Sequence, residues 1–251
     1  MNERKEFHQE PEDLKRPEDD PIIDYKIDTS SHAGGSADKI KIWDTFAKRH
    51  LTEMRILRRS GVLGKKNENW RNVSEHVLVV AAFSKFLADK IKTEDIDRKE
   101  IISAAILHDA AKRIDVEAGV GYDREREEGA FKKILKKEGY SDEFIELCDW
   151  GGRTPEIFYS EEDQDADIAA RPVAQLILAY ADTRTRNTDV VTLEEARDKN
   201  KEKVPKDVDF YDQWYAFYKK VESRIFEKIE GIKPEDINNK NVTLNLVEDG
   251  Q

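Results

Sequence analysis

Apolar residues in the middle of this chain recur every three or four positions, which is the spacing of one face of an α-helix. Three segments with this spacing are strongly apolar, namely residues 72–92, 97–113 and 172–185. Helices of that kind are buried on most sides, so we expect them to form the centre of a helical bundle. The sequence has no internal repeat and no alternation of strands and helices. It therefore predicts one all-α domain over residues 39–231.

Local signals predict where several of these helices begin and end. Asp97, with Glu100 three residues later, is typical of a helix N-terminus, and Pro172 suits a first helical position. Gly61 is expected to end a helix that runs from Ile40 to Ser60. Further helices are expected over residues 122–137, 142–150 and 211–229, with a short one starting at Thr192.

The two ends of the chain differ from the middle in composition. Residues 1–38 contain three of the seven prolines and many charges, and they cannot bury enough apolar surface to offset chain entropy. We predict a disordered tail there, in which residues 21–27 form the one stretch suited to docking on the body. Residues 232–251 are expected to form a flexible polar tail. Apolar and polar residues alternate at 241–247, which predicts one short strand.

The overall composition excludes several classes of protein. No stretch of about 18 apolar residues is present, which excludes a transmembrane helix, and the first thirty residues lack the apolar core of a secretory signal. Cys148 is the only cysteine, so no internal disulfide can form, and we expect a cytoplasmic protein. The formal net charge of −11 argues against nucleic-acid binding, but it is compatible with a small basic pocket.

Each of the three apolar segments carries a histidine or an aspartate, in the order His76, His108-Asp109 and Asp182. Because an unpaired buried carboxylate is costly, the two aspartates must find partners. Two imidazoles and two carboxylates are a suitable ligand set for a divalent transition metal, and facing helices of a bundle can bring such ligands together. A lone histidine on an apolar face is more often a packed core residue. The prediction of a metal site therefore rests on the joint arrangement.

The same order of residues resembles the HD-domain phosphohydrolase superfamily. The matching segments are ENWRNVSEHVLVVAAF, AAILHDAAKRID and LILAYADTRTR, which fall within residues 70–187. The resemblance implies an HD-type helical bundle that holds a divalent ion, one of Mn, Ni, Co, Fe, Zn or Mg. It also implies hydrolysis of a phosphomonoester or phosphodiester, often of a nucleotide.

Residue by residue, His76, His108, Asp109 and Asp182 match the metal ligands of that superfamily, and Lys112 matches the lysine of its HDxxK variant. The resemblance implies that Asp109 and Lys112 are catalytic. Members with two metal ions have one or two further histidines between the His-Asp pair and the last aspartate. This chain has none there, so we expect a single ion. The alternative is a second ion held by carboxylates, for which Glu125, Glu127, Glu128 and Asp149 are the candidates.

Basic residues near these positions are candidates for binding phosphate. Lys112 lies one helical turn after His108, which would place its ammonium group near the metal, although it could instead pair with Asp109 or Asp115. Arg71, Arg184 and Arg186 are predicted to bind the substrate, because guanidinium groups match phosphate oxygens. The alternative for each arginine is an ordinary surface position.

These observations predict a metal-dependent phosphohydrolase that cleaves a small phosphoester, expected to be a nucleotide, with water activated by the metal. The alternative is a catalytically weak or inactive HD-domain protein that senses a nucleotide or binds a partner. The missing histidines and the charged tails favour this alternative. A third interpretation is a structural helical bundle without metal.

Overall fold

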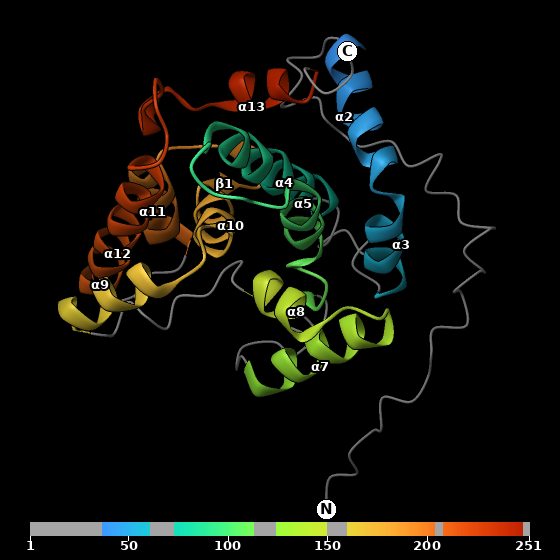
Figure 1. Ribbon diagram of the computed structural model, residues 1–251, viewed down its shortest axis with the longest axis horizontal. Coiled ribbons are helices and arrows are strands. Elements are labelled where there is room, and N and C mark those ends of the chain that lie inside the picture. The colour runs from blue at the N-terminus through green and yellow to red at the C-terminus, as the bar shows by residue number, and fades with distance from the viewer. Residues whose placement is uncertain (1–36, 61–72, 113–123, 150–159, 204–207, 248–251) are drawn as a thin grey trace, which may run out of the picture.

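A computed structural model describes residues 37–60, 73–112, 124–149, 160–203 and 208–247. The prediction of an all-α fold is confirmed, since the strands of the described residues form one small hairpin (Figure 1). The predicted N-terminal tail lies outside the described residues, apart from Ala37 and Asp38, which begin the first described helix. None of the described helices is long and apolar enough to cross a membrane.

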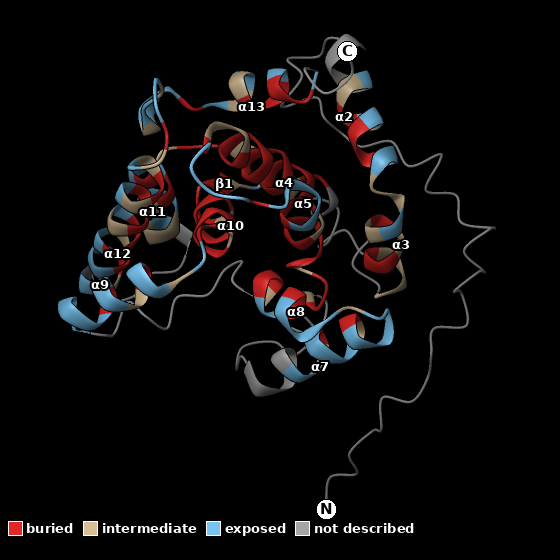
Figure 2. Cartoon of the chain, in the orientation of Figure 1, coloured by how far each residue is buried: buried red, intermediate tan, exposed pale blue. Residues whose placement is uncertain are grey.

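Three helices form the centre of the molecule, as the apolar pattern predicted: α4 (Val73–Lys90), α5 (Arg98–Leu107) and α10 (Val173–Thr183). Helix α4 contacts both of the others, and the three are buried over most of their described length (Figure 2). The Asp97 side chain caps α5 as predicted, accepting hydrogen bonds from the backbone N–H groups of Lys99 and Glu100 at 2.8 and 3.1 Å.

The remaining helices surround this centre (Figure 1). The helix predicted from Ile40 to Ser60 is divided at His50, whose backbone φ and ψ of −117° and 38° are not helical. No helix was predicted after Ser160, yet this residue caps one by accepting from the backbone N–H of Asp163. The surrounding helices are α2 (Ala37–Arg49), α3 (Leu51–Arg59), α7 (Arg124–Lys137), α8 (Asp142–Asp149), α9 (Glu161–Ala170), α11 (Leu193–Lys203) and α12 (Val208–Phe226).

The C-terminal segment corrects two expectations. The strand predicted at 241–247 is wrong, because a 3-10 helix (Pro234–Asp236) is followed by the α-helix α13 (Asn239–Asn245). Val242 and Leu246, four residues apart, lie on one helical face and are buried, and α13 contacts α4. The described part of this segment therefore extends the helical body, where the sequence analysis expected a polar tail.

A short hairpin, which was not predicted from the sequence, joins α10 to α11. Its strands are β1 (Thr185–Arg186) and β2 (Asp189–Val190), paired antiparallel with Thr185 opposite Val190. Asn187, in the turn, has a positive φ of 56°, a conformation that asparagine tolerates better than most residues. The turn lies directly beside the candidate site.

Candidate metal centre

The ends of the three central helices bring the four predicted ligands together. His76 lies in the first turns of α4, His108 and Asp109 directly follow α5, and Asp182 lies in the last turn of α10. His76 Nε2 is 3.0 Å from Asp182 Oδ1, and His108 Nε2 is 3.3 Å from the same oxygen. His108 Nε2 is 3.8 Å from Asp109 Oδ2. The helix predicted over 97–113 ends at Leu107, so His108 and Asp109 lie in a turn.

These separations match those of ligands around a single ion. Metal–ligand bonds of about 2.1 Å place neighbouring donors roughly 3.0 Å apart in octahedral geometry and roughly 3.4 Å apart in tetrahedral geometry. One donor atom each from His76, His108 and Asp109 lies within 4.8 Å of the others. Asp182 is not part of that mutually close group, but it approaches both imidazoles more closely than Asp109 approaches His108. The donor set therefore fits a divalent cation.

Backbone carbonyl groups orient both imidazole rings. His108 Nδ1 lies 2.6 Å from the carbonyl oxygen of Ala105, and His76 Nδ1 lies 3.0 Å from that of Asn187. A carbonyl oxygen can only accept, so each Nδ1 donates its proton and each Nε2 faces the carboxylates. Such outer contacts commonly fix the ring of a metal-binding histidine. Sequence reasoning missed Asn187, although asparagine in a short turn signals a hairpin.

The electrostatics of the centre favour ionised carboxylates beside a cation. Burial alone lowers the pKa of His108, but Asp109 and Asp182 outweigh it and raise that pKa to about 9. Burial opposes ionisation of Asp182, yet the two imidazoles hold its pKa well below the usual value. The pKa of Asp109 is also lowered, against its burial, by Lys112 and the two imidazoles. A metal ion would therefore displace a proton from His108.

Lys112 lies at the edge of this centre. Its Nζ is 3.5 Å from Asp109 Oδ1, and its side chain is about two-fifths exposed. The predicted ion pair with Asp109 is thus present, whereas Asp115 lies outside the described residues. The same position puts the ammonium group within reach of a ligand bound beside Asp109.

Arg184 does not have the predicted role, because its side chain is fully enclosed at 1% exposure. Its guanidinium donates to the carbonyl oxygens of Val191, Pro234 and Ile237 and to the hydroxyl of Tyr180, at 2.6 to 3.2 Å. These bonds use four of the five guanidinium N–H groups, and the enclosed position of the side chain does not fit contact with a phosphate group. Arg184 instead connects the end of α10 to the C-terminal segment.

The other two arginines differ from Arg184. Arg186 is partly exposed and stacks on the ring of Trp214, with its guanidinium carbon 5.8 Å from the ring centroid. Arg71 lies outside the described residues. Cys148 is a buried free cysteine, as its position in an apolar helix predicted.

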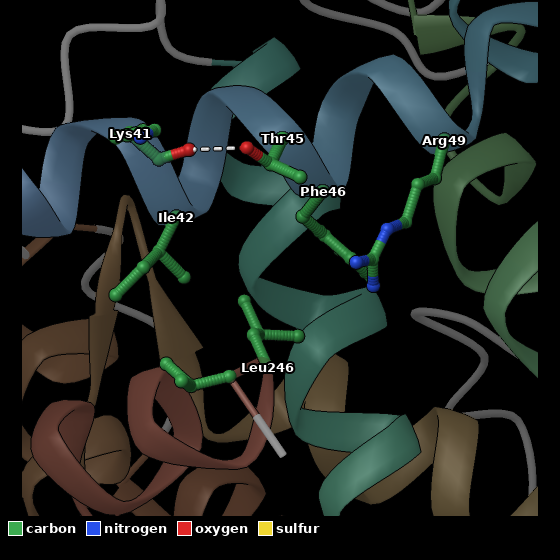
Figure 3. Close-up of a pocket in the computed structure, with 7 residues that line it drawn as sticks. Lys41, Ile42, Thr45, Phe46, Arg49 and Leu246 are labelled. Carbon is green, nitrogen blue, oxygen red and sulfur yellow. Dashed lines mark hydrogen bonds between the residues drawn. The ribbon is translucent and has the colours of Figure 1, made fainter. Parts of the chain in front are cut away.

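A surface pocket of about 290 Å³ is formed elsewhere in the molecule, between α2 and the end of α13 (Figure 3). None of the four predicted metal ligands lines it, so the pocket and the candidate centre are separate features. Its lining residues are Lys41, Ile42, Thr45, Phe46, Arg49, Leu246 and Val247.

Comparisons of the chain with models of known protein families, with curated proteins and with solved structures found no match.

Proposed function

We propose that the protein is a metal-dependent phosphohydrolase of the HD type, with one divalent ion bound by His76, His108, Asp109 and Asp182. One observation carries the proposal: donors from three helices far apart in the sequence converge at separations of 3.0 to 3.8 Å. Without an ion, the buried carboxylates depend on a protonated His108. A divalent ion bound between the four side chains would satisfy both carboxylates and both neutral imidazoles at once.

The reaction would be hydrolysis of a small phosphoester, with a nucleotide as the expected substrate. A divalent ion, when bound, supplies a hydroxide near neutral pH and polarises a phosphoryl oxygen. A bond forms between phosphorus and the water oxygen, the bond between phosphorus and the ester oxygen breaks, and a proton passes to the departing oxygen. The products are an alcohol and a phosphate group with one new oxygen.

The residues of the chain would hold the ion, balance its charge and contact the phosphate. His76 and His108, held by backbone carbonyls, would keep their Nε2 atoms directed at the ion. Asp109 and Asp182 would balance its charge. Lys112, paired with Asp109, would contact an oxygen of the phosphate, where charge increases during the attack.

The first test combines elemental analysis with turnover of generic phosphoesters after addition of Mn, Co or Ni. We expect about one bound ion per chain in the wild type, and loss of both metal and turnover in H108A and D109A. Loss of a hydrogen-bond partner of a metal ligand commonly reduces affinity or activity by about 10- to 100-fold, and loss of a ligand itself should cost at least as much. D182N, which keeps the size of the side chain, separates loss of a ligand from loss of packing.

His50 provides the matched control, because it is a histidine outside the candidate centre. It lies between α2 and α3, and its ring packs against Phe46. H50Q should leave metal content and turnover unchanged. Unchanged values in both H108A and D109A would contradict the assignment. Bound metal with no turnover across a panel of nucleotides would favour the alternative of a nucleotide sensor.

A further inference from the structure

The β1–β2 hairpin holds one of the candidate ligands, but it is too short to be stable alone. Each of its strands has two residues, and an isolated pair of strands is at best marginally stable in water. The carbonyl oxygen of Asn187, in the turn, lies 3.0 Å from His76 Nδ1. The direction of the His76 ring therefore depends on the contacts that fix this hairpin from outside.

The side chain of Asn239, the first residue of α13, binds the second strand at two points. Its Oδ1 accepts a hydrogen bond from the backbone N–H of Val190 at 2.7 Å, and its Nδ2 donates to Asp189 Oδ1 at 3.0 Å. Val190 is buried, so its N–H would be costly without an acceptor. Because a backbone N–H only donates and a carboxylate only accepts, the two partners together require a group with one acceptor and one donor.

The helix that carries Asn239 is fixed to the central helices. Helix α13 contacts α4 (Figure 1), and its Val242 is buried. In the segment just before α13, the carbonyl oxygens of Pro234 and Ile237 accept hydrogen bonds from Arg184, at the end of α10, at 3.0 and 3.2 Å. The carboxamide of Asn239 is thus a fixed point to which the short hairpin is attached.

We infer that Asn239 is a positioning residue of the candidate metal centre and acts on His76 through the hairpin. The carboxamide fixes β2, β2 pairs with β1, and the turn between them holds Nδ1 of His76. Nε2 of the same ring is thereby kept directed at the carboxylate of Asp182, 3.0 Å away. This inference rests on the proposed function, because it takes His76 as a metal ligand. It gives α13 a role in metal binding beyond its packing on α4.

Loss of the carboxamide should loosen the turn and leave the base of the hairpin attached. Thr185, at the start of β1, is 1% exposed, and its hydroxyl donates to the carbonyl oxygen of Ala181 in α10 at 2.7 Å. The backbone N–H of Val191 donates to the carbonyl oxygen of Arg184 at 2.9 Å. Neither contact involves Asn239. The expected effect of removing its side chain is therefore local, a wider range of orientations for the His76 ring.

The first experiment measures the dissociation constant of Mn or Co for the full chain by calorimetry. N239A should raise this constant by roughly 5- to 10-fold, since a direct outer contact of a metal ligand is worth about 10- to 100-fold and Asn239 acts through one further contact. N239D should also weaken binding, because it places two carboxylates side by side. The double variant N239D/D189N exchanges donor and acceptor, keeps both hydrogen bonds and the net charge, and should restore most of the affinity.

A second measurement follows the His76 ring in the metal-free protein and does not depend on turnover. The ring N–H proton of His76 is assigned in NMR spectra by its loss in H76Q, and its exchange with water is measured. We expect faster exchange in N239A and exchange close to that of the wild type in N239D/D189N. Weaker metal binding in N239A with unchanged exchange of this proton would overturn the route through the hairpin.

Asn238 is the matched control, because it is the neighbouring asparagine and its side-chain hydrogen bonds run to residues of the C-terminal segment itself. N238A removes the cap of α13, so it should lower the melting temperature and leave the dissociation constant of the metal unchanged. Equal losses of metal affinity in N238A and N239A would mean that both act through the stability of α13, and would overturn the specific role of the Asn239 side chain.

The inference and the proposed function fail in different ways. Metal binding that is lost in H108A but unchanged in N239A would leave the proposed function standing and overturn the role of Asn239. A wild type that binds no metal, in which N239A still speeds exchange of the His76 ring proton, would refute the metal centre. The support of the His76 ring by Asn239 would then stand without it.

Discussion

Two charged residues near the end of α10 lie close together in the sequence and have different surroundings. Asp182 faces two imidazoles in the candidate centre, and Arg184 is enclosed by three carbonyl oxygens, one of Val191 and two of the C-terminal segment. The Tyr180 hydroxyl accepts from Arg184 and donates to Glu222 at 2.5 Å. One helix terminus therefore carries a candidate ligand on one side and a structural cation on the other.

At this scale, R184M should destabilise the fold, because it leaves the Tyr180 hydroxyl and backbone acceptors unpaired. The expected loss is about 3 to 5 kcal/mol in the free energy of unfolding, measured by urea denaturation. R197M, at an exposed ion pair, should cost under about 1 kcal/mol. A stable R184M protein that has lost phosphate binding would instead support the original prediction for Arg184.

That the four candidate ligands lie together could be predicted from the sequence, because histidine and aspartate are conspicuous in apolar helices. The role of Arg184 could not be predicted, since its acceptors belong to residues 191, 234 and 237. No local sequence pattern indicates contacts with residues so far along the chain. Asn187 contacts His76 through its backbone carbonyl. Because many residue types can make a backbone contact, the sequence does not indicate it.

At the scale of elements, α13 shows how a short pattern can mislead. Apolar residues at 242, 244 and 246 suggest a strand, but the residues at 242 and 246 also share a helical face. Asn238 favours the helix, because its side chain caps the N-terminus of α13 by accepting hydrogen bonds from the backbone N–H groups of Lys240 and Asn241 at 3.0 and 3.3 Å. By contrast, the long apolar repeats of the central helices left no such ambiguity.

Two leucines of this segment give a prediction with an internal control. Leu246 is 6% exposed and packs in the core, whereas Leu244 is 52% exposed. L246A should lower the free energy of unfolding by about 2 to 4 kcal/mol through lost burial and a cavity. L244A should change it by less than about 0.5 kcal/mol. Equal effects in thermal or urea unfolding would contradict the helical arrangement.

At the scale of the whole molecule, Asp89 joins three elements. Its carboxylate accepts hydrogen bonds from Lys85 of α4 and Arg98 of α5 at 2.6 Å, and from Asn245 of α13 at 2.9 Å. Burial opposes ionisation of Asp89, but these donors outweigh it and lower its pKa below the usual 3.8. Two of the central helices, α4 and α5, and the C-terminal helix therefore share one ionised group.

Because folding lowers this pKa, the stabilisation by Asp89 is complete above the pKa of the unfolded chain, about 3.9. It decreases as the pH falls through the lower pKa of the folded state. D89N should cost about 1 to 3 kcal/mol at pH 7, and its difference from the wild type should shrink below about pH 4. A difference that is constant from pH 7 to pH 3 in urea unfolding would exclude this role for the charge.

The turn of the β1–β2 hairpin has one more consequence, for how this chain can change in evolution. Asn187 reaches His76 with its backbone carbonyl, and its own side chain is exposed, so the contact does not require asparagine itself. It requires a residue that tolerates a φ of 56°, such as glycine. A branched side chain there would move the carbonyl and turn the imidazole. The orientation of one candidate ligand can thus be adjusted from the surface while all four candidate ligands stay in place.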